Sequence, residues 1–246
     1  MGYQYVWFAW SLMLLGIWSV VYLVFRNARR RMLAASLITM PFGLTEPLFV
    51  PEYWHPPSLF DLAHRTGFDI ESLLFCFGIG GLGIVLYDLV FRVEHRTMTI
   101  AERFHPRHRF HRWVLASPIL TFVPMYFIVP WNVIYSASLA MFIGGLAAVW
   151  CRPDLNRKVW IGGTFFLLFY IAYFLPLGIL APGYVEKVWT LSALSGVTIM
   201  GIPIEELLFA YTFGMLWSSY YEHLTWMKIP VTIDHPALID HQQRGK

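Results

Sequence analysis

Long apolar runs separated by short polar segments dominate the chain. Each run is long enough for a helix that crosses the hydrocarbon core of a bilayer, which takes about 20 mostly apolar residues. The pattern therefore predicts an all-α, polytopic membrane protein with seven transmembrane helices. The seven runs lie near residues 4–25, 33–51, 69–91, 113–130, 131–150, 159–181 and 197–221.

The basic residues gather in the polar segments on one side of this predicted bundle. If the N-terminus lies outside, all but Arg65 and Lys187 of the 18 Lys and Arg residues fall on the cytoplasmic side. Cytoplasmic loops of membrane proteins carry such an excess of Lys and Arg. With 57% hydrophobic and 13% charged residues the composition agrees, and we expect a multi-pass protein of the cell membrane with its C-terminus inside.

One motif occurs twice along the chain. Residues 70–75, IESLLF, match residues 204–209, IEELLF, and the match extends to Asp88 and Glu222. A fourth helix would restore the orientation between two such units, which predicts a parallel 3+1+3 repeat. The expected divisions are a first three-helix unit at 1–95, a basic cytoplasmic loop with a linker helix at 96–130, a second unit at 131–225 and a cytoplasmic tail at 226–246.

Four acidic residues lie inside the apolar runs. An ionisable group in hydrocarbon costs about 2.5 kcal/mol or more, so such residues usually face a cavity and carry a function. Because no Lys or Arg lies in the predicted spans to pair with them, we expect at least one carboxyl group to keep its proton at neutral pH, as acid catalysis requires. These candidate catalytic residues are Glu46, Glu71, Glu205 and Glu206.

The repeat predicts a ranking of these acids. Successive helix positions point about 100° apart, so Glu205 and Glu206 cannot both face one cavity squarely. Glu205 aligns with Glu71, whereas Glu206 aligns with Ser72, where the first copy has no charge. We therefore expect Glu205 and Glu71 to be the acids on which activity depends most, and Glu206 to matter less.

Aromatic residues are dense around the acids. A ring face presented to a cation stabilises it by about 2 kcal/mol when the site is desolvated. The expected substrate-binding residues are Phe75, Phe209, Tyr211, Tyr173 and Trp54.

Two other patterns predict packing rather than chemistry. Residues 78–83, GIGGLG, satisfy a dinucleotide-binding pattern but lie in mid-span, so they indicate a small-residue face for close helix contact. Cys76 and Cys151 share no motif and are expected to be packing residues.

The basic loop at 92–112 carries several histidines among its arginines. A cation would be repelled there, whereas a polybasic loop suits anionic lipid. We therefore expect no metal site, no other cofactor and no nucleic-acid partner. The histidines concerned are His95, His105, His108 and His111.

The second motif resembles that of a known family, the membrane-integral lycopene beta-cyclases of the heterodimeric or fused type. Their half-units carry a Pro-hydrophobic-Glu-Glu-x-x-Phe pattern near the start of a late helix, and residues 203–209, PIEELLF, match it in full. The first copy keeps Glu71 and Phe75 but has Asp69 and Ser72 in place of the proline and the second acid. The duplicated unit and the helix number extend the resemblance over nearly the whole chain.

The resemblance implies a reaction. A carboxylic acid protonates the terminal double bond of a linear carotenoid, the tertiary cation closes a six-membered ring, and a base removes a proton to leave a beta-ring. This would be an isomerase reaction (an intramolecular lyase) without flavin, in which an apolar polyene comes from the lipid phase. Association with other carotenoid enzymes is a further expectation.

Other classes of protein share some of these features. A transporter with a proton-coupled acidic site would line its path with Asn, Gln and Ser, yet apart from Gln4 at the very start of the first span, Asn132 is the only amide in a predicted span. A non-catalytic carotenoid-binding subunit stays open as an alternative. A retinal receptor is excluded because it needs a lysine in its last helix, and all lysines lie outside the predicted spans: Lys158, Lys187, Lys228 and Lys246.

Overall fold

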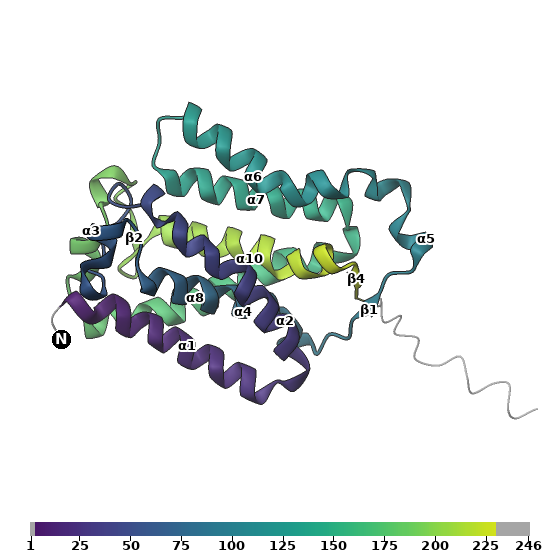
Figure 1. Ribbon diagram of the computed structural model, residues 1–246, viewed down its shortest axis with the longest axis horizontal. Helices are drawn as coiled ribbons and strands as arrows, with labels where there is room; N and C mark the ends of the chain where they lie inside the picture. The colour runs from purple at the N-terminus through teal and green to yellow at the C-terminus, as the bar shows by residue number, and fades with distance from the viewer. Residues whose placement is uncertain (1–2, 230–246) are drawn as a thin grey trace, which may run out of the picture.

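The computed structural model describes residues 3–229 as an elongated helical bundle (Figure 1). The α-helices are α1 (Val6–Val24), α2 (Arg29–Thr39), α3 (Leu62–Thr66), α4 (Ile70–Phe91), α5 (Ile100–Arg103), α6 (His111–Ile128), α7 (Val133–Cys151), α8 (Asn156–Leu180), α9 (Tyr184–Val188) and α10 (Ile204–Thr225). Short 3-10 helices are η1 (Tyr3–Tyr5), η2 (Arg26–Ala28), η3 (Met40–Leu48), η4 (Leu59–Asp61), η5 (Pro106–Phe110), η6 (Pro153–Leu155) and η7 (Leu191–Ala193). The strands are β1 (Arg96–Thr97), β2 (Thr198–Ile199), β3 (Ile202–Pro203) and β4 (Met227–Lys228). The all-α prediction is confirmed.

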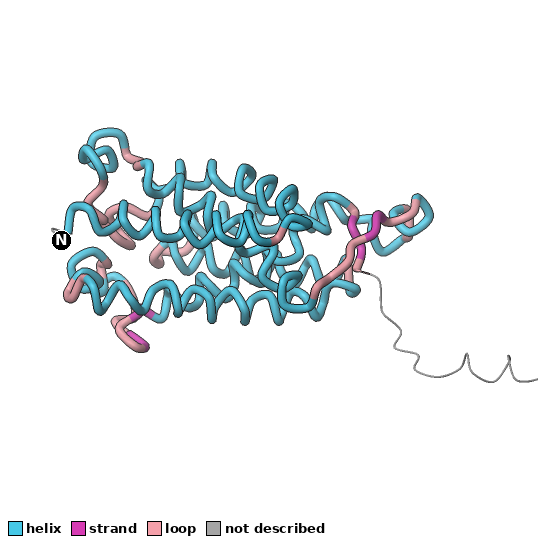
Figure 2. Tube along the Cα trace, turned by 90° about the horizontal axis from the view of Figure 1, so that it is seen from below, coloured by secondary structure: helices cyan, strands magenta, loops and turns pink. Residues whose placement is uncertain are grey.

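Helix α10 is the centre of the bundle. It packs against α8, α7 and α4, while α6 covers α7 on one side and α1 and α2 pack against α4 on the other. The long helices run along the longest axis of the molecule, and their connections gather at its two ends (Figures 1 and 2). We call the end with α5, β1 and β4 the basic end, and the opposite end, where the described chain begins, the N-terminal end.

Within residues 3–229, four helices are long and apolar enough to cross a membrane. They are Tyr3–Val24, Ile70–Phe91, Val133–Cys151 and Pro153–Leu180. These helices agree with the membrane localisation predicted from hydropathy.

The second predicted span is not one regular helix. The predicted range 33–51 is covered by α2 and then η3, because Pro41 stands at the start of η3 and Pro47 lies inside it. Proline has no amide hydrogen, and its ring clashes with the preceding helical turn, which weakens α-helical geometry around it. The effect depends on context, since α6 continues through Pro118 and Pro124 and α8 through Pro176. The change of helix type places Glu46 on η3.

The last predicted span begins later than the hydropathy suggests. Strands β2 and β3 pair as a hairpin across Met200 and Gly201, which have φ angles of 56° and 77°. Positive φ at both central residues is typical of the tight turn that joins two antiparallel strands. Helix α10 therefore starts at Ile204, and the prediction of a span from residue 197 was wrong by one short hairpin.

The glycines of α4 let neighbouring helices approach closely. A Cβ added at Gly80 would meet the side chain of Thr39, and one at Gly81 would meet Ser36 and Trp18. Small residues at such contacts allow backbones to come together. These glycines therefore serve the packing of α1 and α2 on α4, as the sequence indicated.

Strand β4 holds the end of the described chain against the basic loop. Lys228 pairs with Arg96, and Met227 with Thr97. The predicted tail at 226–246 begins here, but its residues 230–246 lie outside the described part of the chain.

Candidate active site

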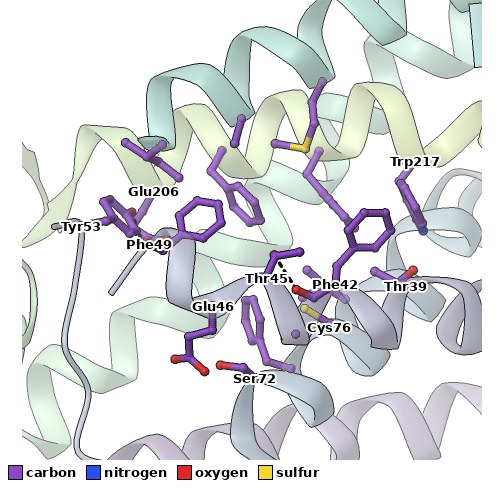
Figure 3. A pocket seen from close by; sticks show the side chains of 18 of the residues that line it. Thr39, Phe42, Thr45, Glu46, Phe49, Tyr53, Ser72, Cys76, Glu206 and Trp217 are labelled. Carbon is purple, nitrogen blue, oxygen red and sulfur yellow. Dashed lines mark hydrogen bonds between the residues drawn. The ribbon is translucent and has the colours of Figure 1, made fainter. Parts of the chain in front are cut away.

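A cavity of about 400 Å³ lies inside the bundle and is lined almost wholly by apolar atoms. Among the described residues that line it, Glu46 and Glu206 are the only charged ones, and none is Lys, Arg or His. Figure 3 shows these two acids on separate elements, η3 and α10. The rings that line the cavity belong to Trp7, Trp10, Phe42, Phe49, Tyr53, Trp54, Phe75, Phe122, Tyr170, Tyr173, Phe174, Tyr184, Trp189, Phe209, Phe213, Trp217 and Tyr220.

Glu206 is held by three hydrogen-bond donors. Its Oε1 accepts from the Tyr53 hydroxyl and, at 2.8 Å, from Trp189 Nε1, while its Oε2 accepts from the Tyr170 hydroxyl at 2.5 Å. The side chain lies in the first turn of α10 and is buried. Hydrogen bonds to a carboxylate are among the stronger ones in proteins, so this set of donors fixes the orientation of the carboxyl group.

Two of these donors, Tyr53 and Trp189, come together because their loops pair with each other at the N-terminal end, while Tyr170 comes from α8. Trp54 and Trp189 form an isolated antiparallel bridge, and the Thr190 amide donates to the Tyr53 carbonyl at 3.0 Å. Burial first, and then the Glu206 carboxylate, raise the pKa of the Tyr53 phenol well above its usual range. Tyr53 therefore stays protonated and remains a donor at neutral pH.

Glu46 lies on another part of the cavity wall. Its Oε2 accepts from the Asp69 amide at 3.2 Å, and within the described residues its buried Oε1 has no hydrogen-bond partner. Asp69 in turn caps α4 by accepting from the Ser72 amide at 2.6 Å, and Ser72 also lines the cavity (Figure 3). A buried oxygen without a donor is unusual in a protein. Asp69, Glu71, Glu205 and Glu222 each have one such oxygen as well, but of these five acids only Glu46 lines the cavity.

Glu71 and Glu205 do not line the cavity. Glu71 accepts from the Leu59 amide at 2.7 Å, and Glu205 accepts from the Ser195 amide at 2.9 Å and the Tyr135 hydroxyl at 2.6 Å. Both acids thus hold the loop that precedes their own helix. The orientation expected from the repeat is corrected here, since Glu206 and not Glu205 is turned to the cavity.

The expected substrate-binding rings divide in a similar way. Phe75, Phe209, Tyr173 and Trp54 line the cavity, whereas Tyr211 does not. Tyr211 follows Phe209 by two positions, or about 200° around the helix, and its ring packs near Gly163 of α8.

Tyr53, Tyr170 and Trp189 are the site residues that sequence reasoning missed. All three stand in aromatic-rich segments, so their residue type alone does not separate them from packing rings. The signal that links Tyr53 to Trp189 is the pairing of their loops, which hydropathy does not reveal.

A buried cluster of charges lies towards the opposite, basic end of the bundle. Lys158 Nζ lies 2.6 Å from Asp88 Oδ1 and 2.5 Å from Glu222 Oε1, His95 Nε2 lies 2.8 Å from the same Glu222 oxygen, and Arg31 contacts Asp88. The expectation that Lys158 lies outside the helices was wrong, because it is the third residue of α8 and is 1% exposed. Its two carboxylate partners explain why it is buried as a charged group.

Lys158 does not change the exclusion of a retinal receptor. A Schiff-base lysine is required in the last helix, and the last long helix that the structure describes, α10, contains no lysine. Lys158 stands on α8 and is held by two acids instead.

Two groups of metal-ligating side chains stand outside the cavity in the described part of the chain. One is His108, His111 and Cys151, and the other is made of acids and a histidine from the charge cluster. In the second group, Lys158 and Arg31 already neutralise the carboxylates, so only the first group fits a metal ion.

Together, the fold and the site define a helical membrane protein with a buried acid in an apolar cavity. The model of the lycopene cyclase family matches residues 132–224. This part of the chain, which contains Tyr170, Trp189 and Glu206, is therefore similar to the lycopene cyclase family. No curated protein and no solved structure matches the chain.

Proposed function

We propose that the protein is a carotenoid cyclase of the beta type, which closes rings on the ends of a linear carotenoid without redox chemistry. The observation that carries the proposal is Glu206, buried in an apolar cavity and held by three donors. The match of the lycopene cyclase family to the part of the chain that contains Glu206 supports it.

In the proposed reaction, Glu206 gives its proton to the terminal carbon–carbon double bond of the polyene. The tertiary carbocation that results is attacked by a neighbouring double bond, which forms the new carbon–carbon bond of a six-membered ring. Loss of a proton from the ring carbon next to the new cation leaves the ring double bond. Since one proton enters and one leaves, the product is an isomer of the substrate.

The hydrogen bonds to Glu206 favour this direction of proton transfer. When the carboxyl group loses its proton, the Tyr53, Tyr170 and Trp189 donors point at the oxygens where negative charge develops. Donors that are already in position cost no reorganisation at that moment, which is the main source of electrostatic catalysis. Glu46, whose Oε1 has no donor among the described residues, is proposed to accept the proton that leaves the ring.

Aromatic rings near Glu206 would stabilise the cation between these steps. Trp189 lies 5.5 Å, centroid to centroid, from both Trp54 and Phe174, and these rings line the cavity. A cation over such a ring gains about 2 kcal/mol in a desolvated site. The rings also keep water away, which would otherwise trap the cation as an alcohol.

The substrate is proposed to arrive sideways from the lipid. The cavity lining includes Ile38 and Phe42 from α2 and η3 and Ile119 from α6, and these side chains are 40%, 50% and 63% exposed. An opening between η3 and α6 would therefore face the apolar phase in which a carotenoid dissolves. A path for sugars or similar polar solutes would be lined with amides, yet none of the described lining residues is Asn or Gln.

The class of reaction is tested by expressing the chain in cells that accumulate lycopene and separating their pigments by chromatography. We expect monocyclic or bicyclic carotenes with the mass of lycopene. A Tyr211→Phe variant is a matched control, because Tyr211 does not line the cavity, and it should give the same pigments. Unchanged lycopene in cells whose membranes contain the protein would overturn the proposal.

We also propose that seven segments span the membrane, with the N-terminal end outside. Support comes from the helical segments found in all seven predicted ranges and from the gathering of the basic loops at one end of the bundle (Figure 1). A reporter fused after Lys246 should then behave as cytoplasmic, and one inserted beside Trp54 as external. The reverse pattern would contradict this topology.

We propose the 3+1+3 repeat on the evidence of three pairs of aligned positions. Ser72 and Glu206 both line the cavity, and Glu71 and Glu205 both accept from the backbone of the preceding loop. The third pair, Asp88 and Glu222, shares the Lys158 ammonium group. These three pairs support the proposed repeat.

A further inference from the structure

A cluster of three metal-ligating side chains closes the basic end of the bundle. His108 stands on η5, His111 is the first residue of α6, and Cys151 is the last residue of α7. Cys151 Sγ lies 3.5 Å from His108 Nδ1 and 3.9 Å from His111 Nδ1, and the three ligand atoms all lie within 4.8 Å of one another.

The two sulfur–nitrogen separations are close to those of a tetrahedral zinc site. With Zn–S bonds of about 2.3 Å and Zn–N bonds of about 2.0 Å, two ligand atoms on a tetrahedral centre lie roughly 3.5 Å apart. The 3.5 Å separation matches this value, and the 3.9 Å separation needs a shift of only a few tenths of an ångström. A thiolate with imidazoles is a set that favours Zn²⁺ over harder ions such as Mg²⁺ or Ca²⁺.

A fourth residue supplies an independent sign of a ligand. His223 of α10 is 1% exposed, and within the described residues neither of its ring nitrogens has a hydrogen-bond partner. Its ring stacks on that of His111 with the centroids 4.4 Å apart. A fully buried imidazole without any hydrogen-bond partner is rare, which indicates that a bound group such as a metal ion would be the partner of His223.

We infer that His108, His111 and Cys151 bind Zn²⁺, with His223 as the residue that completes the set after a rotation of its side chain. The site would join the start of α6 to the ends of α7 and α10, which meet beside β4 (Figure 1). A metal at that point would be a structural cross-link. It would lie outside the cavity and would hold together three of the helices that form the cavity walls.

The charge of the arginine next to Cys151 is offset by an acid. Arg152, which follows Cys151, is buried but already engaged, with Nε 2.9 Å from Asp154 Oδ1 and a second nitrogen 2.7 Å from Asp154 Oδ2. The expectation of no metal site rested on the residues of the basic loop at 92–112 alone. Cys151 and His223 reach the cluster from distant parts of the chain.

The inference is tested by metal analysis of the full chain purified in detergent after exposure to Zn²⁺ and removal of the excess. We expect about one zinc per wild-type chain and per Cys76→Ser chain, and at least a tenfold loss in Cys151→Ser and His108→Ala. Removal of zinc by a chelator should lower the unfolding temperature of the wild type and leave that of Cys151→Ser unchanged. Zinc contents that are equal in the wild type and Cys151→Ser would overturn the site.

Cobalt gives a second measurement, and its test of Cys151 uses only the wild-type protein, so that it does not depend on how a variant folds. Co²⁺ bound to wild-type protein should show the near-ultraviolet band of a thiolate–metal bond and the visible bands of tetrahedral cobalt. Absence of the thiolate band would refute the role of Cys151. A visible spectrum that does not change in His223→Gln would remove His223 from the ligand set.

Discussion

Glu206→Gln is expected to lower the rate of ring formation by about 100-fold or more, because the amide cannot give a proton to the polyene. The amide keeps the size of the side chain, so the protein should still reach the membrane and bind carotenoid. The measurement is turnover of lycopene in liposomes by purified protein, with the amount of folded protein matched between variants.

The matched control is Glu205→Gln, one position earlier on the same helix. Because Glu205 holds the Ser195 loop and does not line the cavity, its variant should keep most of its turnover. A Glu206→Gln enzyme as fast as the wild type would remove Glu206 as the acid. If Glu205→Gln also had a much lower turnover than the wild type, the ranking that the repeat suggests would be restored.

Lys158→Met is expected to destabilise the protein by roughly 3–5 kcal/mol, the usual range when one partner of a buried ion pair is removed. Lys158, Asp88 and Glu222 are each at most 4% exposed, so methionine would remove the cation that the two carboxylates share and leave only Arg31 and His95 beside them among the described residues. The measurement is the unfolding midpoint of purified protein in detergent.

Lys187→Met is the control for that experiment, since Lys187 is exposed and its ammonium group lies over the ring of Tyr3 rather than in a buried ion pair. It should unfold close to the wild-type midpoint. Adding Glu222→Gln to Lys158→Met should recover part of the lost stability, because it removes one of the two facing charges. A Lys158→Met protein that unfolds at the wild-type midpoint would show that the cluster contributes little.

Hydropathy predicted where helices lie but not how they end. The apolar content of residues 33–51 and 197–221 is the same whether the backbone is α-helical or not. The difference from the prediction lies in the local backbone. Pro41 and Pro47 occur where 33–51 departs from the α-helix, and Met200 and Gly201 have positive φ angles where 197–221 begins with a hairpin. Both features are visible in the sequence as proline and glycine, but their consequence depends on the turn that each one forms.

The choice between Glu205 and Glu206 depended on contacts that no single-sequence pattern records. The acid kept in both copies of the motif, at positions 71 and 205, is the one that anchors a loop in each half. The presence of the same acid in both copies of the motif is therefore explained as well by a structural role as by a catalytic one. Glu206 is distinguished by partners from two distant loops and from α8, which only the tertiary structure brings together.

Lys158 was misplaced for a similar reason. Hydropathy ends a span at the first charged residue, whereas a lysine enters a helix bundle when acids on its neighbours offset its charge. Asp88 and Glu222 were visible as equivalent positions of the repeat, and their common partner follows from the packing of α4 and α10 on α8.

The most direct test of proton transfer as the central chemistry is ring formation by purified protein in D₂O, with lycopene in liposomes and without flavin or nicotinamide. In the proposed cycle Glu206 regains its proton from solvent after each turnover, so each new ring should carry a single deuterium, seen as one additional mass unit per ring by mass spectrometry. Glu206→Gln should form no labelled product above about 1% of the wild-type yield. Rings formed without deuterium, or formed only when a reduced cofactor is added, would contradict acid catalysis by this site.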